Sequence, residues 1–224
     1  MVLVFHEMDE IADDVWEFRF VPKSRVEYVP GQYARFTFPY VIPDPRGKQH
    51  RTFTLISHPS EPQIRFITRL DETLSDYKQH LFALQPGDIV HIDEPHGDAV
   101  LPRLGTTPLV FVAQGIAIAS YISMLQECVL SDLGHSITLA WARRSEDNTL
   151  EKLIPGEIRL LTRVDVAYPA RLMATDILRY CQPNGLIYLS GSQTFVETLG
   201  AELEIRNIPR ERLIYDYYEG YPVL

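Results

Sequence analysis

The pattern of apolar residues changes once along this chain, near residues 102–108, and that change most limits the folds open to it. Before it, short runs such as Tyr33–Phe38 and Ile64–Leu70 alternate apolar with polar residues, which is typical of half-buried strands. After it, short apolar runs alternate with longer segments of helical periodicity. The Gly- and Pro-containing segment between them reads as a linker. The sequence therefore predicts two domains, residues 1–103 and 104–224.

The first half reads as a small antiparallel β-barrel with one helix. Turns such as Pro30-Gly31 and Pro86-Gly87 separate its strands, and Thr73 with Asp76 has the spacing of a capping box that begins the helix. The acidic link Met8–Asp14 reads as a solvated turn, with a partner-docking surface as the alternative. The expected strands are Val2–Glu7, Val15–Val21, Tyr33–Phe38, His50–Ser57, Ile64–Leu70, Ile89–Asp93 and Ala99–Leu101.

The second half alternates strands with helices, which predicts a parallel sheet covered on both faces. Such sheets bind ligands beyond the carboxyl ends of their strands, so the strand-to-helix turns are the places to look for a site. The expected strands are Leu109–Ala113, Ser136–Ala142, about Val164–Ala167, Leu186–Ser190 and Leu213–Tyr217, with helices at Ile118–Leu130, Ala170–Tyr180 and Thr194–Arg206.

Charge and cysteine content exclude several classes of function. The net charge is −9 and neither half is basic, which argues against nucleic-acid binding. Cys128 and Cys181 are far apart and form neither a disulfide framework nor a metal-ligand set, so we expect no metal site and a reduced, cytoplasmic protein. No apolar stretch approaches the length of a membrane span.

The stretch His50–Ser57 carries an unusual set of groups for a strand. Its alternation places Arg51, Phe53 and Leu55 on one side and Thr52, Thr54 and Ile56 on the other. A guanidinium that forks onto phosphate, an aromatic face and a hydroxyl together suit a phosphorylated, planar, redox-active ligand. An edge strand with an ordinary surface arginine is the alternative.

This stretch resembles the Arg-x-Tyr-Ser signature of the ferredoxin-NADP reductase superfamily. The resemblance implies that Arg51 holds the phosphate of a flavin, that Phe53 stacks on the isoalloxazine ring, and that Thr54 lies near the reactive nitrogen. Thr52, between Arg51 and Phe53, is also expected to contact the cofactor. It also implies the two-domain fold, with FAD bound to the barrel and NAD(P)H to the parallel sheet.

Other flavin contacts follow from the same resemblance. Ile67, Thr68 and Arg69 match the next flavin-contacting strand, although Arg69 reads equally as a surface residue. Thr73, Leu74 and Ser75 stand where the family has a Gly-x-x-Ser element for the pyrophosphate. A plain helix N-cap explains Ser75 nearly as well.

The nicotinamide side is matched more loosely. The turn at residues 113–120 resembles a Gly-Gly-x-Gly-Ile-x-Pro loop, in which Gly115, Ile116 and Ala117 would contact the dinucleotide, while Gln114 and Ser120 replace a Gly and the Pro. Arg143 and Arg144 would face the adenosine side; two exposed arginines that cap a strand are the alternative.

The last two matches concern the chemistry itself. Ser190 replaces a cysteine that lies close to the nicotinamide in many relatives, and Gly191 after it would contact the dinucleotide. Tyr218 or Tyr221 in the C-terminal tail would cover the flavin face, unless an aromatic merely fills the gap between the domains.

The implied function is an FAD-dependent oxidoreductase in which Thr54, Ser190 and Tyr218 assist hydride transfer from NAD(P)H. The electron acceptor would be a ferredoxin, a flavodoxin or a small molecule. An acidic protein acceptor needs a basic patch, which Lys23, Arg25, Arg35, Arg46 and Lys48 would supply. The alternatives are a flavin-binding electron-transfer subunit and a degenerate binding module.

Overall fold

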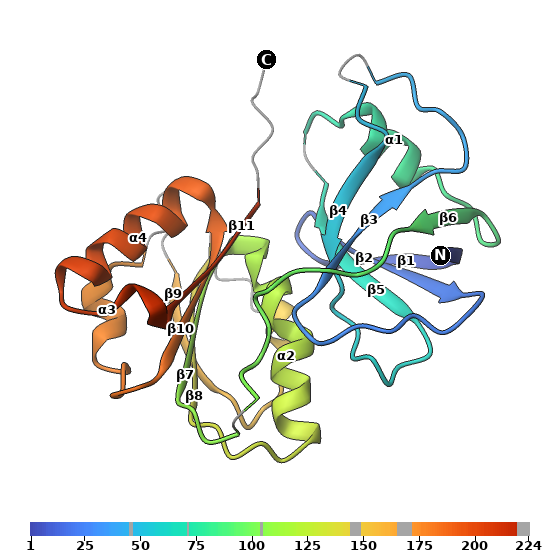
Figure 1. Ribbon diagram of the computed structural model, residues 1–224. Coiled ribbons are helices and arrows are strands. Elements are labelled where there is room, and N and C mark those ends of the chain that lie inside the picture. Colours follow the sequence, from blue (N-terminus) through green and yellow to red (C-terminus); the bar gives the residue numbers. More distant parts are fainter. Residues whose placement is uncertain (45–46, 71, 104, 144–148, 165–171, 219–224) are drawn as a thin grey trace.

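The chain folds around two separate sheets, one antiparallel and one parallel (Figure 1). The computed structural model describes residues 1–44, 47–70, 72–103, 105–143, 149–164 and 172–218. The six-stranded sheet belongs to the first half of the chain and the five-stranded sheet to the second half. The predicted fold class is therefore confirmed, while the boundary between residues 103 and 104 stays a prediction.

The first sheet is antiparallel and curls into a barrel. Its strand order is β4-β3-β6-β1-β2-β5, and its two end strands approach each other where Ile56 N–H donates to the carbonyl of Arg65 at 2.8 Å. The bounds are β1 Val2–Ala12, β2 Val15–Pro22, β3 Tyr33–Thr37, β4 His50–Thr54, β5 Ile64–Arg69 and β6 Ile89–Ile92, with helix α1 at Asp76–Phe82.

Aromatic side chains fill the barrel. Phe66 on β5 stacks on Phe53 of β4, with ring centroids 4.0 Å apart, and on Phe18 of β2 at 5.2 Å. Phe36 of β3 meets Phe53 edge-on. Because these rings come from four strands, their burial fixes which face of each strand points inward.

Three details of the barrel differ from the sequence prediction. The acidic link is mostly strand, because β1 continues to Ala12 and only Asp13 and Asp14 make the turn, Asp14 with φ of 59°. The helix N-cap is Ser75, which accepts from Lys78 N–H, so the capping box at Thr73 was wrong. Residues 99–101 form no strand, and the carbonyl of Val100 accepts from Tyr188 Oη at 2.7 Å instead.

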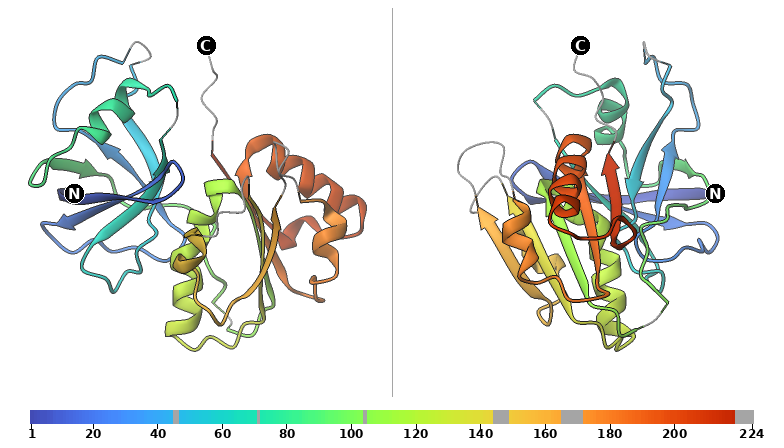
Figure 2. Two further views of the ribbon diagram at one scale, coloured as in Figure 1. Left: turned by 180° about the vertical axis from the view of Figure 1, so that it is seen from behind. Right: turned by 60° about the vertical axis from the view of Figure 1, so that its left-hand side comes forward.

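The second sheet is parallel, with the order β11-β10-β7-β8-β9, and helices cover both of its faces (Figure 2). Strand β9 begins earlier than predicted and α3 is shorter than its apolar pattern; residues 165–171 between them lie outside the described residues. The bounds are β7 Leu109–Gln114, β8 Ile137–Arg143, β9 Arg159–Val164, β10 Leu186–Ser192, β11 Leu213–Tyr218, α2 Ala119–Leu130, α3 Ala174–Leu178, α4 Gln193–Ile205, and the 3₁₀ turns η1 Gly115–Ile118, η2 Thr149–Leu153 and η3 Arg210–Arg212.

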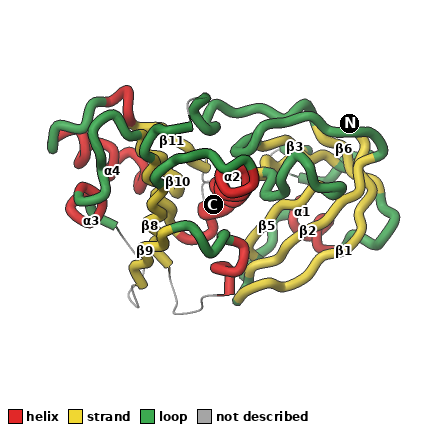
Figure 3. Tube along the Cα trace, turned by 90° about the horizontal axis from the view of Figure 1, so that it is seen from below, coloured by secondary structure: helices red, strands yellow, loops and turns green. Residues whose placement is uncertain are grey.

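Helix α2 lies between the parallel sheet and the barrel, while α3 and α4 cover the far face (Figure 3). Val15, Ile56 and Ile67 point out of the barrel and join the apolar core under α2. The two domains therefore share buried surface, which restrains their relative motion.

Polar contacts reinforce this junction. The Pro30-Gly31 turn forms as predicted, with Gly31 at φ of 99°, and its N–H donates to Ser123 Oγ of α2 at 3.2 Å. A Cβ at Gly31 would lie 2.4 Å from the carbonyl oxygen of Ala99, so only glycine fits there. His58 Nε2 lies 2.6 Å from a carboxylate oxygen of Glu127, also on α2.

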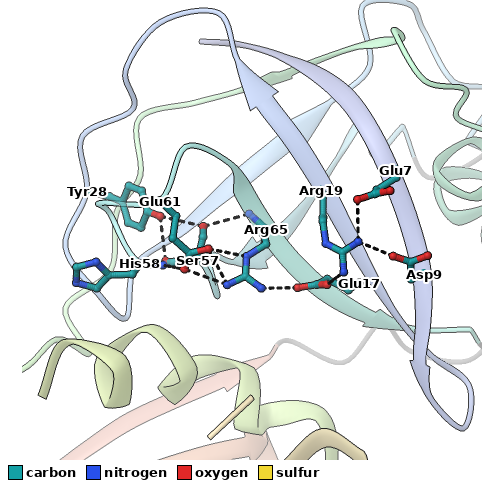
Figure 4. A network of polar contacts seen from close by, with 9 residues as sticks. All are labelled: Glu7, Asp9, Glu17, Arg19, Tyr28, Ser57, His58, Glu61 and Arg65. Atoms are coloured by element: carbon teal, nitrogen blue, oxygen red, sulfur yellow. Dashed lines mark hydrogen bonds and ion pairs between the residues drawn. The ribbon is translucent and has the colours of Figure 1, made fainter. Parts of the chain in front are cut away.

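A charged network on the outer face of β1, β2 and β5 positions the loop that carries His58 (Figure 4). Glu17, 2% exposed, lies between Arg19 and Arg65. Arg65 also binds Glu61 at 2.9 Å, and Glu61 accepts from His58 N–H at 2.8 Å. A buried carboxylate between two guanidinium groups has its charge compensated, so the network holds the loop against the barrel.

Candidate cofactor site

The strand order of the parallel sheet predicts a ligand-binding crevice between β7 and β10. The chain runs from β7 to β8 and β9 on one side, then crosses to β10 and β11 on the other. Open parallel sheets bind ligands where the strand order reverses, beyond the carboxyl ends of the strands. The 3₁₀ turn η1 and the start of α4 lie at this point.

The two glycines predicted for the dinucleotide line this crevice. Gly115 begins η1 with φ of 58° and nothing within 4 Å of a Cβ built on it, so its backbone faces open space. A Cβ at Gly191 would meet Phe195 Cδ1 at 2.7 Å and Gln114 Cβ at 3.1 Å. Gly191 thus allows β7 and β10 to end close together, while Ala117 is buried and Ile116 is half-buried beside them.

Ser190 takes part in a buried chain of hydrogen bonds at the crevice. Its Oγ donates to Asp216 Oδ2 at 3.0 Å, and its partner on the other side is Ser120 Oγ, also at 3.0 Å. A serine hydroxyl has one proton, so Ser120 must be the donor to Ser190 when Asp216 is ionised. The structure therefore orients the Ser190 hydroxyl through two residues whose roles the sequence did not reveal.

Gln114, which replaces a family glycine, reaches across the crevice. Its Oε1 accepts from Ser192 Oγ, the N-cap of α4, at 3.3 Å. Below it, Trp141 Nε1 donates to the carbonyl of Gly115 at 2.8 Å and anchors η1 to β8. The side chain of Gln114 thus links the turn after β7 to the start of α4, the two places between which a dinucleotide is expected to bind.

Arg143 does not have the exposed position that the adenosine role requires. Its residue surface is only 9% exposed, it pairs with Glu151 at 2.7 Å, and its guanidinium carbon lies 5.3 Å from the centre of the Trp141 ring. Arg144 lies outside the described residues. The adenosine contact stays a prediction, and the alternative of an exposed Arg143 is wrong.

In the barrel, β4 has the predicted alternation, and this divides the flavin motif between two faces. Arg51 and Phe53 point inward, Thr52 is exposed, and Thr54 is outward but only 6% exposed. Beyond Thr54, Ile56 contacts the core of the second domain. Thr54 therefore lies on the side of the strand that faces the parallel sheet, whereas Arg51 lies at the end of the barrel near α1.

Arg51 is buried and its charge is balanced within the chain. Its side chain is 8% exposed and lies 3.4 Å from Asp44, whose side chain is 2% exposed. It also donates to the carbonyl of His50 at 2.9 Å, and its guanidinium carbon lies 5.1 Å from the centre of the Tyr77 ring. The alternative of an ordinary surface arginine is wrong. Periodicity did not identify Asp44 as the partner of Arg51.

Phe53 is a core residue, 9% exposed, with one face stacked on Phe66 at an interplanar angle of 6°. A ring in this position offers no flat face to the space between the domains. To stack on a flavin as the motif implies, Phe53 would have to leave Phe66. Its stacking role stays a prediction that this arrangement does not favour.

The remaining flavin positions lie along β5 and its link to α1. Ile67 points toward the second domain, whereas Thr68 is buried inside the barrel. Arg69 is half-buried, and its carbonyl accepts a hydrogen bond from Lys78 Nζ at 2.6 Å. Thr73 is exposed and Leu74 and Ser75 are half-buried, with Ser75 acting as the N-cap. None of these roles is tested by the geometry alone.

The C-terminal aromatic residues are only partly described. Tyr218 ends β11, opposite Ser192 in the register, but its side chain lies outside the described part of the chain, as does all of Tyr221.

The predicted basic patch is also only partly described. Arg46 lies outside the described residues, Arg35 pairs with Asp93 at 2.9 Å, and Lys48 is exposed. Burial and the nearby positive charges of Arg35, Arg51 and Lys48 lower the pKa of His50. The role of the basic patch in docking an acidic acceptor stays a prediction.

The residues present fit a flavin dinucleotide in their chemistry. Arg51, on the inward face of β4, can fork onto a diphosphate, and Thr54, on the outward face, brings a hydroxyl to the side of the strand that faces the parallel sheet. Arg51 would exchange Asp44 for the diphosphate in the process.

The described residues contain neither a metal-binding cluster nor a helix that could span a membrane. Within them, no cluster of three or more His, Cys, Asp or Glu side chains is arranged to hold a metal ion. Among the helices of the described part of the chain, none has the length and hydropathy to cross a bilayer.

The fold and the crevice define a class of protein in which an antiparallel barrel adjoins a parallel sheet with a dinucleotide-type switch point. No family model matches the chain. It is 22% identical to flavohemoprotein A of Dictyostelium discoideum, over 93% of this chain and 58% of that protein. It is 26% identical to the ferredoxin–NAD(P)+ reductase component of naphthalene 1,2-dioxygenase/salicylate 5-hydroxylase systems from Ralstonia, over 86% and 61% respectively.

Among solved structures, a flavohemoglobin from Malassezia yamatoensis with bound FAD and heme superposes with a TM-score of 0.78 at 19% identity, covering 97% of this chain and 59% of that one. The chain spans about three fifths of the length of the two curated relatives. These relatives and neighbours are ferredoxin-NADP reductase-like proteins, and the resemblance seen in the sequence is confirmed.

Proposed function

We propose that this chain is an FAD-dependent oxidoreductase that takes a hydride from NAD(P)H and passes the electrons to an acceptor. The single observation that supports this most strongly is the similarity to the ferredoxin–NAD(P)+ reductase component from Ralstonia, which extends over 86% of this chain. One of the structural neighbours holds FAD. Arg51, Thr54 and the β7–β10 crevice supply chemistry that suits the two cofactors.

Each domain would contribute one half of the site. Arg51 would hold the diphosphate of FAD at the end of the barrel near α1. Thr54 would lie near the flavin ring, where the two domains meet. When bound, the flavin supplies the hydride-accepting and electron-transferring chemistry. Ser190, oriented by Ser120 and Asp216, would contact the nicotinamide side, and the buried core under α2 would keep the two halves aligned.

The test is direct. Purified protein loaded with FAD should have a flavin absorption spectrum, and anaerobic NADH or NADPH should bleach it rapidly in a stopped-flow instrument. Protein that takes up no FAD would contradict the proposal and leave the degenerate binding module. The acceptor is then sought among ferredoxins, flavodoxins and small molecules by their reoxidation of the reduced flavin.

Gln114 favours a second candidate, a flavin-binding electron-transfer subunit that receives or delivers electrons through a protein partner. Its contact with Ser192 narrows the crevice where nicotinamide dinucleotide would bind. Under this candidate, FAD binds but neither NADH nor NADPH bleaches it.

The variant Gln114→Ala separates the two candidates. If the chain is an NAD(P)H oxidoreductase with a narrowed crevice, the variant should be reduced faster at low NAD(P)H than the wild type. Ser192→Ala, which removes the hydrogen bond but keeps the Gln114 side chain, is the matched control. No bleaching of either protein would favour the electron-transfer subunit.

A further inference from the structure

Residues 38–44 and 47–49, the described part of the segment between β3 and β4, form a strap over the end of the barrel, and Asp44 on it lies beside Arg51. Ile42 on this strap is 1% exposed and belongs to the barrel core. The side chain of Gln49 accepts from Ile42 N–H at 2.7 Å and donates to its carbonyl at 3.0 Å. This pair of bonds acts like a strand bridge made by one side chain, so the strap has a fixed position.

The strap also contacts helix α1. Phe38 lies 5.0 Å from the centre of the Tyr77 ring, and Tyr40 Oη lies 3.4 Å from His80 Nδ1. Tyr77 is fully buried and its hydroxyl donates to the carbonyl of Phe36 at 2.9 Å. Anchored at both ends, the strap places Asp44 beside the guanidinium that lies over Tyr77.

A buried guanidinium without an anion is costly, so some negative group must accompany Arg51 whether or not a ligand is present. In this structure Asp44 has that role. The contact of 3.4 Å is longer than the roughly 2.7–2.9 Å of a tight charge-assisted hydrogen bond. A diphosphate carries more charge than a carboxylate and can fork onto the guanidinium, so it would compete well for the same group.

We propose that Asp44 is an internal competitor of the cofactor diphosphate: the strap neutralises Arg51 in the apoprotein and must yield it when FAD binds. This inference rests on the proposed flavin function. It makes Asp44 a residue that sets cofactor affinity, and it makes FAD occupancy depend on movement of the strap.

The proposal predicts that the stability of the apoprotein and its affinity for a diphosphate change in opposite directions when Asp44 is replaced. Replacing Asp44 removes a buried negative charge 3.4 Å from the Arg51 guanidinium, so the apoprotein should become less stable. The same replacement removes the competitor, so affinity for a diphosphate should rise. A carboxylate that instead oriented Arg51 for its ligand would lower both stability and affinity when removed.

The experiment measures FAD and ADP binding to apoprotein by fluorescence titration, together with thermal melting, for wild type and Asp44→Asn. ADP carries the diphosphate without the flavin. We expect Asp44→Asn to bind both ligands more tightly, on the order of tenfold, and to melt at a lower temperature without ligand. Asp93→Asn, which breaks the exposed Arg35–Asp93 pair on the outer face of the barrel, is the control and should change neither affinity.

Gln49→Ala is the second variant if Asp44→Asn does not fold. It keeps every charge and releases the strap from Ile42, so it should also tighten FAD binding. Unchanged or weaker binding by the folded variants, while the wild type binds FAD, would overturn the strap proposal alone. Failure of the wild type and both variants to bind FAD or ADP would overturn it together with the flavin function.

Discussion

At the residue scale, the strand β4 assigns different environments to neighbouring side chains, and this allows a test of the flavin motif. Thr54 is 6% exposed and outward, next to the surface shared with the second domain, whereas Thr52 on the same face is exposed. If the Thr54 hydroxyl bonds to the flavin ring, Thr54→Val should slow reduction by NAD(P)H while it preserves the shape of the side chain.

The loss of one neutral hydrogen bond is worth about 0.5–1.5 kcal/mol, so the rate of flavin reduction should fall by roughly twofold to tenfold. Stopped-flow reduction at saturating NAD(P)H measures it, with Thr52→Val as the matched control. FAD affinity should change little, because the diphosphate provides most of the charged contacts. An unchanged rate would remove Thr54 from the predicted catalytic group.

The sequence predicted the kinds of residue at the site better than their partners. The alternation of β4 followed from polar and apolar spacing alone, and it is confirmed. The Asp44–Arg51 pair did not follow, because it depends on how the loop between β3 and β4 folds back onto β4. The Ser120–Ser190–Asp216 chain did not follow, because it depends on how distant segments approach. Periodicity contains no information on contacts between residues 70 positions apart.

At the element scale, helix α4 packs on β11 through a single glycine. The ring of Tyr215 lies where a Cβ at Gly200 would be, 2.2 Å from its Oη and 2.7 Å from its Cε1. On its other face, the Arg210 guanidinium carbon lies 3.8 Å from the ring centre, and Glu204 accepts from Tyr215 Oη at 3.2 Å. The ring is thus held between two elements and has little freedom to yield.

Gly200→Ala should therefore destabilise the protein, although alanine is the better helix former. We expect a loss of about 1–3 kcal/mol in the free energy of unfolding, typical of overpacking. Chemical denaturation measures it. Gly156→Ala, where a Cβ meets nothing within 4 Å, is the control, and Tyr215→Leu in the Gly200→Ala background should recover stability. A stable single variant would contradict the packing described here.

Whether a segment is a helix or a strand was predictable where its periodicity was strong. The residues at which helices and strands begin and end were not. The helix α2 and the strands β7, β8, β10 and β11 follow from their apolar patterns, whereas β9 overlaps its predicted range only at Val164. The predicted strand at residues 99–101 failed because the carbonyl of Val100 bonds to Tyr188 of the other domain rather than to a neighbouring strand. The predicted turn at Met8–Ala12 failed because pairing with Trp16 and Glu17 on β2 outweighs its acidic composition.

At the scale of the whole molecule, the order of motifs along the chain predicted two domains, but their junction required the structure. Val15, Ile56 and Ile67 appear as ordinary strand residues in the sequence, yet they complete the core of the other domain. Polar contacts join the same surfaces, including Gly31 with Ser123 and His58 with Glu127. The alignment of the two cofactor halves therefore depends on groups outside both halves.

The His58–Glu127 contact makes the stability of this junction depend on pH. Hydrogen bonds from Ser131 and from His58 lower the pKa of Glu127 below its ordinary value of 4.5. A carboxyl group whose pKa is lower in the folded protein stabilises the fold at pH values above 4.5, and this contribution is lost as the pH falls through the folded-state pKa. Glu127→Gln, which cannot ionise, lacks the contribution at every pH.

Wild type should consequently melt a few degrees above Glu127→Gln at neutral pH, since the hydrogen bonds to this partly exposed carboxylate contribute up to about 1 kcal/mol. The gap should close as the pH is lowered below 4.5. Melting curves over a pH series measure it, with the exposed Glu157→Gln as the charge-matched control. A gap that persists at low pH would mean that Glu127 acts through packing rather than charge. If the junction also aligns the cofactors, the rate of flavin reduction by NAD(P)H should fall in Glu127→Gln while FAD affinity stays the same.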